Sequence, residues 1–215
     1  NDAGTADAAI ALTSTAGGIT LASSAGLSVT GDTHTFSSAN TTDPLFIIKN
    51  TTNDANSSRL QFVKDKGEDG AANDVAGLIQ FIADDASQQQ VMFSEIKSQV
   101  KVATNGQEGG KFTISVAEND GTSTSGLVIE DGNADGELDV TIGAGTSSNL
   151  TIPGNATLSG DLSLDGSNKE LRFSETSGNG TNYVGFEAPA AIAANEIWVL
   201  PAADGSANQV LKTNG

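Results

Sequence analysis

The stretch Lys111–Val116 reads KFTISV and alternates strictly between polar and apolar side chains. Glu137–Ile142, which reads ELDVTI, repeats this pattern. Successive side chains of a β-strand point to opposite faces of a sheet, so a period of two places Phe112, Ile114 and Val116 on one face and their polar neighbours on the other. Both stretches are therefore predicted to be strands that bury one face and keep the other in water.

Shorter apolar runs extend this pattern into a predicted central β domain of residues 44–143. Leu45–Ile48 and Leu60–Val63 are strand candidates near its beginning, and Leu78–Ala83 and Gly126–Glu130 are further candidates. Segments rich in Gly, Asn, Asp and Lys separate these runs, and such segments are typical of turns and loops. The domain is therefore predicted to contain short strands joined by polar connections.

One segment of this domain, Val91–Val102, fits two structures. Met92, Ile96 and Val100 recur at the four-residue spacing of a helix, whereas the apolar residues at its two ends also fit a strand with a bulge. β-branched residues end the segment, and the surrounding sequence favours strands. We therefore predict a strand here, with a helix as the alternative.

Residues 1–43 have a simpler composition, rich in Ser, Thr, Ala and Gly. An apolar–small–apolar triplet recurs at Ile10–Leu12, Ile19–Leu21 and Leu27–Val29. The repetition indicates very short strands stacked by turns, as in a fibrous shaft. A flexible linker is the alternative for this segment.

The C-terminal part of the chain has a similar pattern of short apolar runs. Between Ala156 and Leu164, apolar residues alternate with Ser, Thr and Asp, which predicts a fibrous β-repeat segment over residues 144–180. In the C-terminal β segment, residues 181–215, strands are predicted at Tyr183–Glu187, Glu196–Leu200 and Gln209–Lys212. Because the chain lacks an initial Met and ends in a turn-like KTNG, we expect a processed chain or part of a longer protein.

Charge and composition limit the functions that this chain can have. Its 215 residues carry a formal net charge of -17, from 27 acidic and 10 basic side chains. Such a chain repels phosphate backbones, so nucleic-acid binding is not expected. The absence of cysteine excludes disulfides, thiol catalysis and thiolate metal sites within the chain. No apolar run approaches the length of a membrane-spanning helix, so membrane insertion is not expected either.

The supply of apolar side chains is small for a chain of this length. Leu, Ile, Val and Phe together form about 22% of the sequence, barely above the level typical of disordered chains. A single chain would therefore have a thin core, and we expect other chains to supply the missing burial. The predicted fold class is all-β, with an antiparallel sandwich-like knob flanked by slender fibrous β-shaft segments.

Seven phrases of the sequence carry a family resemblance: PLFIIKN (44–50), LQFVKDKG (60–67), NDVAGLIQF (73–81), GGKFTI (109–114), YVGFEAP (183–189), WVLPAADG (198–205) and QVLKTNG (209–215). They resemble segments of tail-fibre and other virion structural proteins of bacteriophages, particularly marine ones. The phrases are architectural rather than catalytic. The resemblance implies a parallel homotrimer whose intertwined chains wind around a common axis.

The best candidate for a metal site is the acidic loop DGNADGELD at residues 131–139. It matches the first nine positions of an EF-hand-type calcium loop, with oxygen-bearing side chains at the usual places and Gly at the sixth position. Ile142 stands where such a loop needs a bidentate Glu, and no flanking helix is evident. A plain acidic hairpin turn is therefore the alternative. The predicted calcium ligands are Asp131, Asn133, Asp135, Glu137 and Asp139.

Three other candidate sites each have a plainer explanation. His34, the single histidine, could meet its copies around an ion at a trimer axis, but we favour the interpretation as an exposed or packed side chain in a Thr-rich strand. Asp84 and Asp85 suggest the carboxylate pair of glycoside hydrolysis, yet neighbours in a strand face opposite sides. Tyr183 and Trp198 could stack on sugars, although single aromatic residues more often pack against protein. We therefore predict no catalytic residues and no enzymatic activity.

The expected function is a structural segment of a phage tail fibre or virion appendage that positions a receptor-binding tip. The expected location is the virion surface, outside the cell. The expected partners are two further copies of the chain, other fibre or baseplate proteins, and a glycan or protein of the host surface. Two alternatives remain open: a calcium-stiffened bacterial adhesin or extracellular filament module, and a carbohydrate-binding spike.

Overall fold

The computed structural model describes residues 14–23, 27–167, 169–195 and 197. Within these residues all regular structure is β-strand, and no helix forms. The all-β prediction is therefore confirmed. Among the described residues there is also no helix that is long and apolar enough to cross a membrane.

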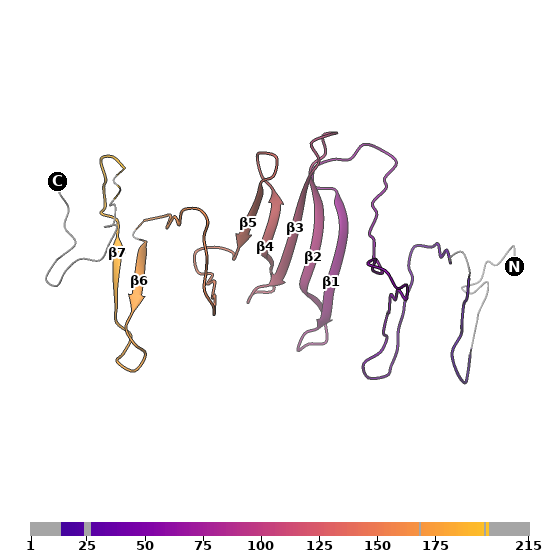
Figure 1. Ribbon diagram of the computed structural model, residues 1–215. Coiled ribbons are helices and arrows are strands. Elements are labelled where there is room, and N and C mark those ends of the chain that lie inside the picture. The colour runs from indigo at the N-terminus through magenta and orange to yellow at the C-terminus, as the bar shows by residue number, and fades with distance from the viewer. Residues whose placement is uncertain (1–13, 24–26, 168, 196, 198–215) are drawn as a thin grey trace.

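Five strands form one antiparallel sheet in which spatial order follows chain order. They are β1 (Val75–Asp84), β2 (Gln90–Val102), β3 (Gly109–Ala117), β4 (Ser123–Asp131) and β5 (Leu138–Ile142). A separate two-stranded antiparallel sheet pairs β6 (Glu170–Ser174) with β7 (Tyr183–Glu187). Figure 1 shows the segment before β1, the five-stranded sheet and the β6–β7 pair following one another along one axis.

Short polar turns connect neighbouring strands of the large sheet. Between β1 and β2, the Asp85 carboxylate accepts hydrogen bonds from the backbone N–H groups of Ser87 and Gln89 at 2.7 and 2.9 Å. Between β3 and β4, Gly121 has φ +82°, which a residue with a side chain adopts only with strain. Such tight turns bring consecutive strands side by side, and the result is a meander.

The ambiguous segment Val91–Val102 is a strand, so this prediction is confirmed. It forms most of β2, which pairs with β1 on one side and β3 on the other. The register shifts between Val100 and Val102 on the β3 side, and between Met92 and Ser94 on the β1 side. Because both edges of β2 are hydrogen-bonded, pairing with two neighbours overrides the helical spacing of its apolar residues.

Several predicted strands do not form a ladder within the single chain. Leu45–Ile48 and Leu60–Val63 have no strand assignment, although Ser58 Oγ donates a hydrogen bond of 3.0 Å to the carbonyl of Ile48. The triplets at Ile19–Leu21 and Leu27–Val29 and the alternating run at 156–164 are likewise unpaired. The strand predictions for these segments are wrong for the isolated chain, because no second segment among residues 14–23, 27–167, 169–195 and 197 aligns its backbone with theirs.

Three further predicted elements lie outside the described residues. They are Ile10–Leu12, Gln209–Lys212 and, apart from Ile197, Glu196–Leu200.

The five-stranded sheet is a single layer. No apolar side chain is buried among the described residues, and large apolar side chains are exposed from Ile19 to Ile197. Within the described part of the chain no second sheet packs on the first, so the predicted sandwich is not present in one copy and stays a prediction. The sheet therefore has two open faces, and their chemistry decides what each can contact.

Candidate interaction surface

One row of aliphatic side chains crosses all five strands of the sheet. Cross-strand pairing places Ile79 opposite Ile96, Ile96 opposite Ile114, Ile114 opposite Leu127, and Leu127 opposite Ile142. Directly opposed residues in an antiparallel pair point to the same face. These five residues form the aliphatic row.

Further apolar side chains lie on the same face beside this row. On one side, the register aligns Phe112, Ile129 and Val140 across β3, β4 and β5. On the other side, Phe81 of β1 and Val116 of β3 both lie opposite Ser94 of β2. We refer to the aliphatic row and these two flanking rows as the apolar face.

The apolar face also continues beyond the edge of the sheet. A Cβ atom added to Gly77 would lie 3.1 Å from Cβ of Phe62, so the Phe62 side chain sits over the glycine. Gly77 belongs to the row that holds Phe112, because it pairs with Ser98 and Ser98 pairs with Phe112. Phe62 therefore covers the edge strand β1 and extends the apolar face toward the preceding segment.

In this sheet large apolar side chains are exposed and small polar ones are buried, which is the reverse of a soluble single-chain domain. Phe112 is 38% exposed, Phe81 51% and Ile142 58%, whereas buried side chains include those of Thr113 and Ser115. Small polar residues on a single-layer sheet are shielded by larger neighbours, while large apolar ones protrude into water. Because exposed apolar area is unfavourable in water, the apolar face is the strongest candidate for a contact surface.

The opposite face of the sheet carries charges that are paired with one another. Glu95 forms an ion pair of 3.1 Å with Lys97, and its other carboxylate oxygen accepts a hydrogen bond of 3.3 Å from Gln80. Glu130 lies 3.5 Å from Lys111 and 3.7 Å from Lys101. Leu78 and Val128 accompany these residues, but the ionic groups make this face suited to water, and we refer to it as the polar face.

The predicted calcium loop is a β-hairpin turn between β4 and β5. The N–H of Gly132 donates to the carbonyl of Glu137 at 3.2 Å, and the Glu137 carboxylate accepts a hydrogen bond of 2.8 Å from the N–H of Asn133. The carbonyl of Asp131 accepts a hydrogen bond from Lys101 Nζ. Asp139 lies in β5 opposite Glu130. Backbone and lysine donors thus occupy part of the oxygen set that calcium would need.

No three acidic or histidine side chains in the described part of the chain are grouped so as to hold a metal ion. Calcium binding stays a prediction for Asp131, Asn133, Asp135, Glu137 and Asp139, and it requires the turn to rearrange.

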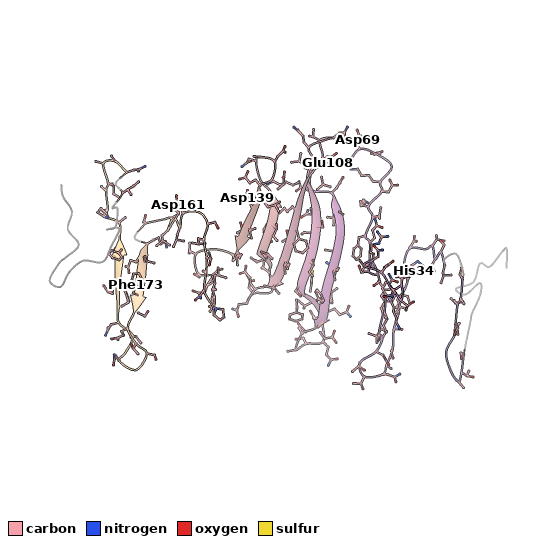
Figure 2. All side chains as sticks on the ribbon, viewed as in Figure 1. His34, Asp69, Glu108, Asp139, Asp161 and Phe173 are labelled. Carbon is pink, nitrogen blue, oxygen red and sulfur yellow. The ribbon has the colours of Figure 1, made fainter. Side chains whose placement is uncertain are left out.

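In Figure 2, His34 lies on one side of the five-stranded sheet and Asp161 on the other. The Asp85 carboxylate accepts the hydrogen bonds of the turn between β1 and β2, and a paired role of Asp84 and Asp85 stays untested.

Tyr183 is engaged within its own two-stranded sheet. The guanidinium of Arg172 lies 4.3 Å from the centroid of the Tyr183 ring, and Arg172 Nε lies 2.7 Å from the Glu170 carboxylate. The hydrogen bond from Arg172 lowers the pKa of Glu170 below its ordinary value. Phe173 and Phe186 meet edge to face at 6.4 Å between ring centroids. Trp198 lies outside the described residues, so the proposed pair of sugar-stacking aromatics cannot be assembled from this structure.

The sequence predicts the apolar alternation within each strand, but it does not predict which apolar residues of neighbouring strands lie opposite one another. The period of two assigns Ile114 to a face, yet it does not say that Ile96 and Leu127 flank it at the same level. The contact of Phe62 with Gly77 has one sequence signal, a glycine within an apolar strand, which often marks a close approach. The ion pair of Lys101 with Glu130 has no sequence signal, because it depends on the bulge in β2.

Comparison with known proteins finds no matching family model, no similar curated protein and no similar solved structure.

Proposed function

We propose that this chain is a structural segment of a phage tail fibre or related virion appendage, assembled as a homotrimer and without catalytic activity. The observation that carries the proposal is the apolar face, which a single chain leaves in water. In this account three copies cover one another and together complete the sandwich-like knob. The segment then acts as a spacer that positions a receptor-binding tip away from the virion.

The linear order of the elements supports a spacer rather than a compact binding module. The strands of the large sheet follow chain order, and the unpaired segments on both sides carry exposed apolar residues such as Phe46 and Leu162. A fibre distributes its contacts along its length, whereas a compact domain concentrates them in one core. The phrases that resemble phage tail-fibre segments are the reason for proposing a virion rather than another filament.

The net charge of -17 is compatible with such an assembly. The three rows of the apolar face contain no charged side chain, so copies can meet there without burying a charge. Acidic side chains in the turns, and Asp139 on the polar face, stay in water, where they favour solubility of the filament.

The solution mass of the intact chain tests this proposal. Light scattering should give three times the chain mass of 21.7 kDa, with and without a calcium chelator. A monomer at every concentration would overturn the homotrimer and the fibre with it. A trimer that dissociates on chelation would instead favour the calcium-stiffened filament module, and a sugar-dependent thermal shift would favour the carbohydrate-binding spike.

A further inference from the structure

We propose that the apolar face is the surface through which copies of this chain associate, with the copies parallel and in register and the polar face turned outward. The inference rests on the proposed homotrimer and names the residues at its axis. In this arrangement the aliphatic row of each copy packs against the aliphatic rows of the others.

The amount of exposed surface requires a large partner. A folded monomer of this mass has an accessible surface of about 9200 Å² by the usual scaling of area with mass. The chain has 19695 Å², roughly twice that value. The excess is several times the ~1600 Å² that a standard protein–protein interface buries, so a small ligand or one compact docking domain covers only a fraction of it.

The distribution of this surface identifies the partner as a second copy. Exposed apolar side chains extend from Leu45 and Phe46 before β1, through Ile79 and Ile142 at the ends of the half-buried aliphatic row, to Leu162 and Leu164 after β5. The occupant must present apolar groups along the same length and at the same intervals. A second copy of this chain does so by construction, provided that it lies parallel and in register.

The shape of the apolar face also suits contact with itself. Phe112 stands beside Ser98, and Phe81 stands beside Ser94, so bulky and small side chains alternate across β1, β2 and β3. A ring from one copy can fill the depression above a serine of another, which is how interiors reach close packing. On the polar face, Lys97, which pairs with Glu95, and Lys111, which pairs with Glu130, are partly exposed and would lose water on association.

Single cysteine variants test the assignment, because the natural chain contains no cysteine. Ile79→Cys and Ile142→Cys lie at opposite ends of the aliphatic row. Leu78→Cys and Thr141→Cys are their neighbours in β1 and β5 and point to the polar face, so they are matched controls. Each full-length variant is treated with a short bismaleimide cross-linker at a concentration where light scattering shows the assembly.

The expected result is conversion of Ile79→Cys and Ile142→Cys to cross-linked dimer and trimer, while Leu78→Cys and Thr141→Cys stay as single chains on a denaturing gel. Cross-linking at both ends of the row requires parallel copies, since an antiparallel pair brings together only residues near its twofold axis. Circular dichroism checks that each variant keeps its β-structure.

A second pair of variants gives an independent readout. Ile142→Asp should reduce the assembly to single chains at a concentration at which Thr141→Asp, with the same added charge, remains assembled. Preferential cross-linking of the polar-face cysteines, or dissociation by Thr141→Asp alone, would overturn the face assignment while leaving the homotrimer intact. A natural chain that is monomeric throughout would overturn the proposed function as well.

Discussion

Ile96 of β2 and Ile114 of β3 are directly opposed across the sheet, and both project from the apolar face. Neither is buried, although each lies on a strand with a hydrogen-bonded neighbour on both sides. In a self-contained domain this central pair would be part of the core. Here the pair is only half-buried, and we therefore expect the stability of the fold to depend on chain concentration.

Truncating the centre of the aliphatic row should destabilise the assembled protein strongly. In Ile114→Ala, the partner copies would pack against a cavity, and such losses cost about 2–5 kcal/mol when the site is covered. Val128→Ala on the polar face should change the free energy of unfolding by no more than about 0.5 kcal/mol, as is usual for surface sites. Urea unfolding at one fixed chain concentration measures both, and equal losses would contradict a covered apolar face.

The β6–β7 sheet should not tolerate a side chain at Gly185. A Cβ atom there would lie 2.7 Å from the carbonyl oxygen of Leu171, closer than real Cβ contacts, and a backbone atom cannot rotate away. Gly185→Ala is therefore expected to disrupt pairing of the two strands. Gly178→Ala is the control, since a Cβ atom at Gly178 meets nothing within 4 Å.

Hydrogen exchange of the Phe173 amide, which lies on the side of β6 that faces β7, measures this effect on the β6–β7 sheet. We expect faster exchange in Gly185→Ala and unchanged exchange in Gly178→Ala. Equal protection in both variants would show that the backbone can shift to accept the methyl group.

Asp74 should titrate below its ordinary pKa of 3.8. The hydrogen bond from Lys66 Nζ at 2.9 Å is the main cause, and the N–H of Ala71 at 2.8 Å adds to it. Because the pKa is lower in the folded state, the stabilising contribution is fully present above the unfolded pKa. It is lost as the pH falls through the folded pKa.

Carboxyl-carbon NMR titration of Asp74 checks this pH dependence. Lys66→Met should raise the pKa of Asp74 toward its ordinary value, and Lys64→Met should raise it less, because Lys64 acts only through its more distant charge. An unchanged pKa in Lys66→Met would show that the ion pair does not persist in solution.

The calcium hypothesis predicts a saturable heat on titration of the chain with calcium. Asp135→Asn should remove that heat, because an EF-hand-type loop depends on the charge of its carboxylate ligands. Asp120→Asn, in the turn between β3 and β4, should leave it unchanged. The absence of heat up to millimolar calcium would leave residues 131–139 as a hairpin turn and nothing more.

The strands that the sequence predicts best are those that pair with two neighbours or follow a clean alternation. KFTISV at Lys111–Val116 lies within β3, and Glu137–Ile142 contains β5. The runs at Leu45–Ile48 and Leu60–Val63 are equally apolar but have no strand pairing in one chain. Local composition cannot tell these cases apart, because a strand exists only when a second backbone supplies its hydrogen bonds.

For the candidate surface, too, some properties follow from the sequence and others only from the tertiary structure. From its sequence alone, this chain is determined to be acidic, free of cysteine, poor in large apolar residues and built on a period of two, because these properties belong to residues and their order. Only the tertiary structure decided that Ile79, Ile96, Ile114, Leu127 and Ile142 form one row, because register depends on turn lengths and bulges that act between strands. It also decided that no residue of this row is buried, because the part of the chain that the structure describes provides no second layer to cover it.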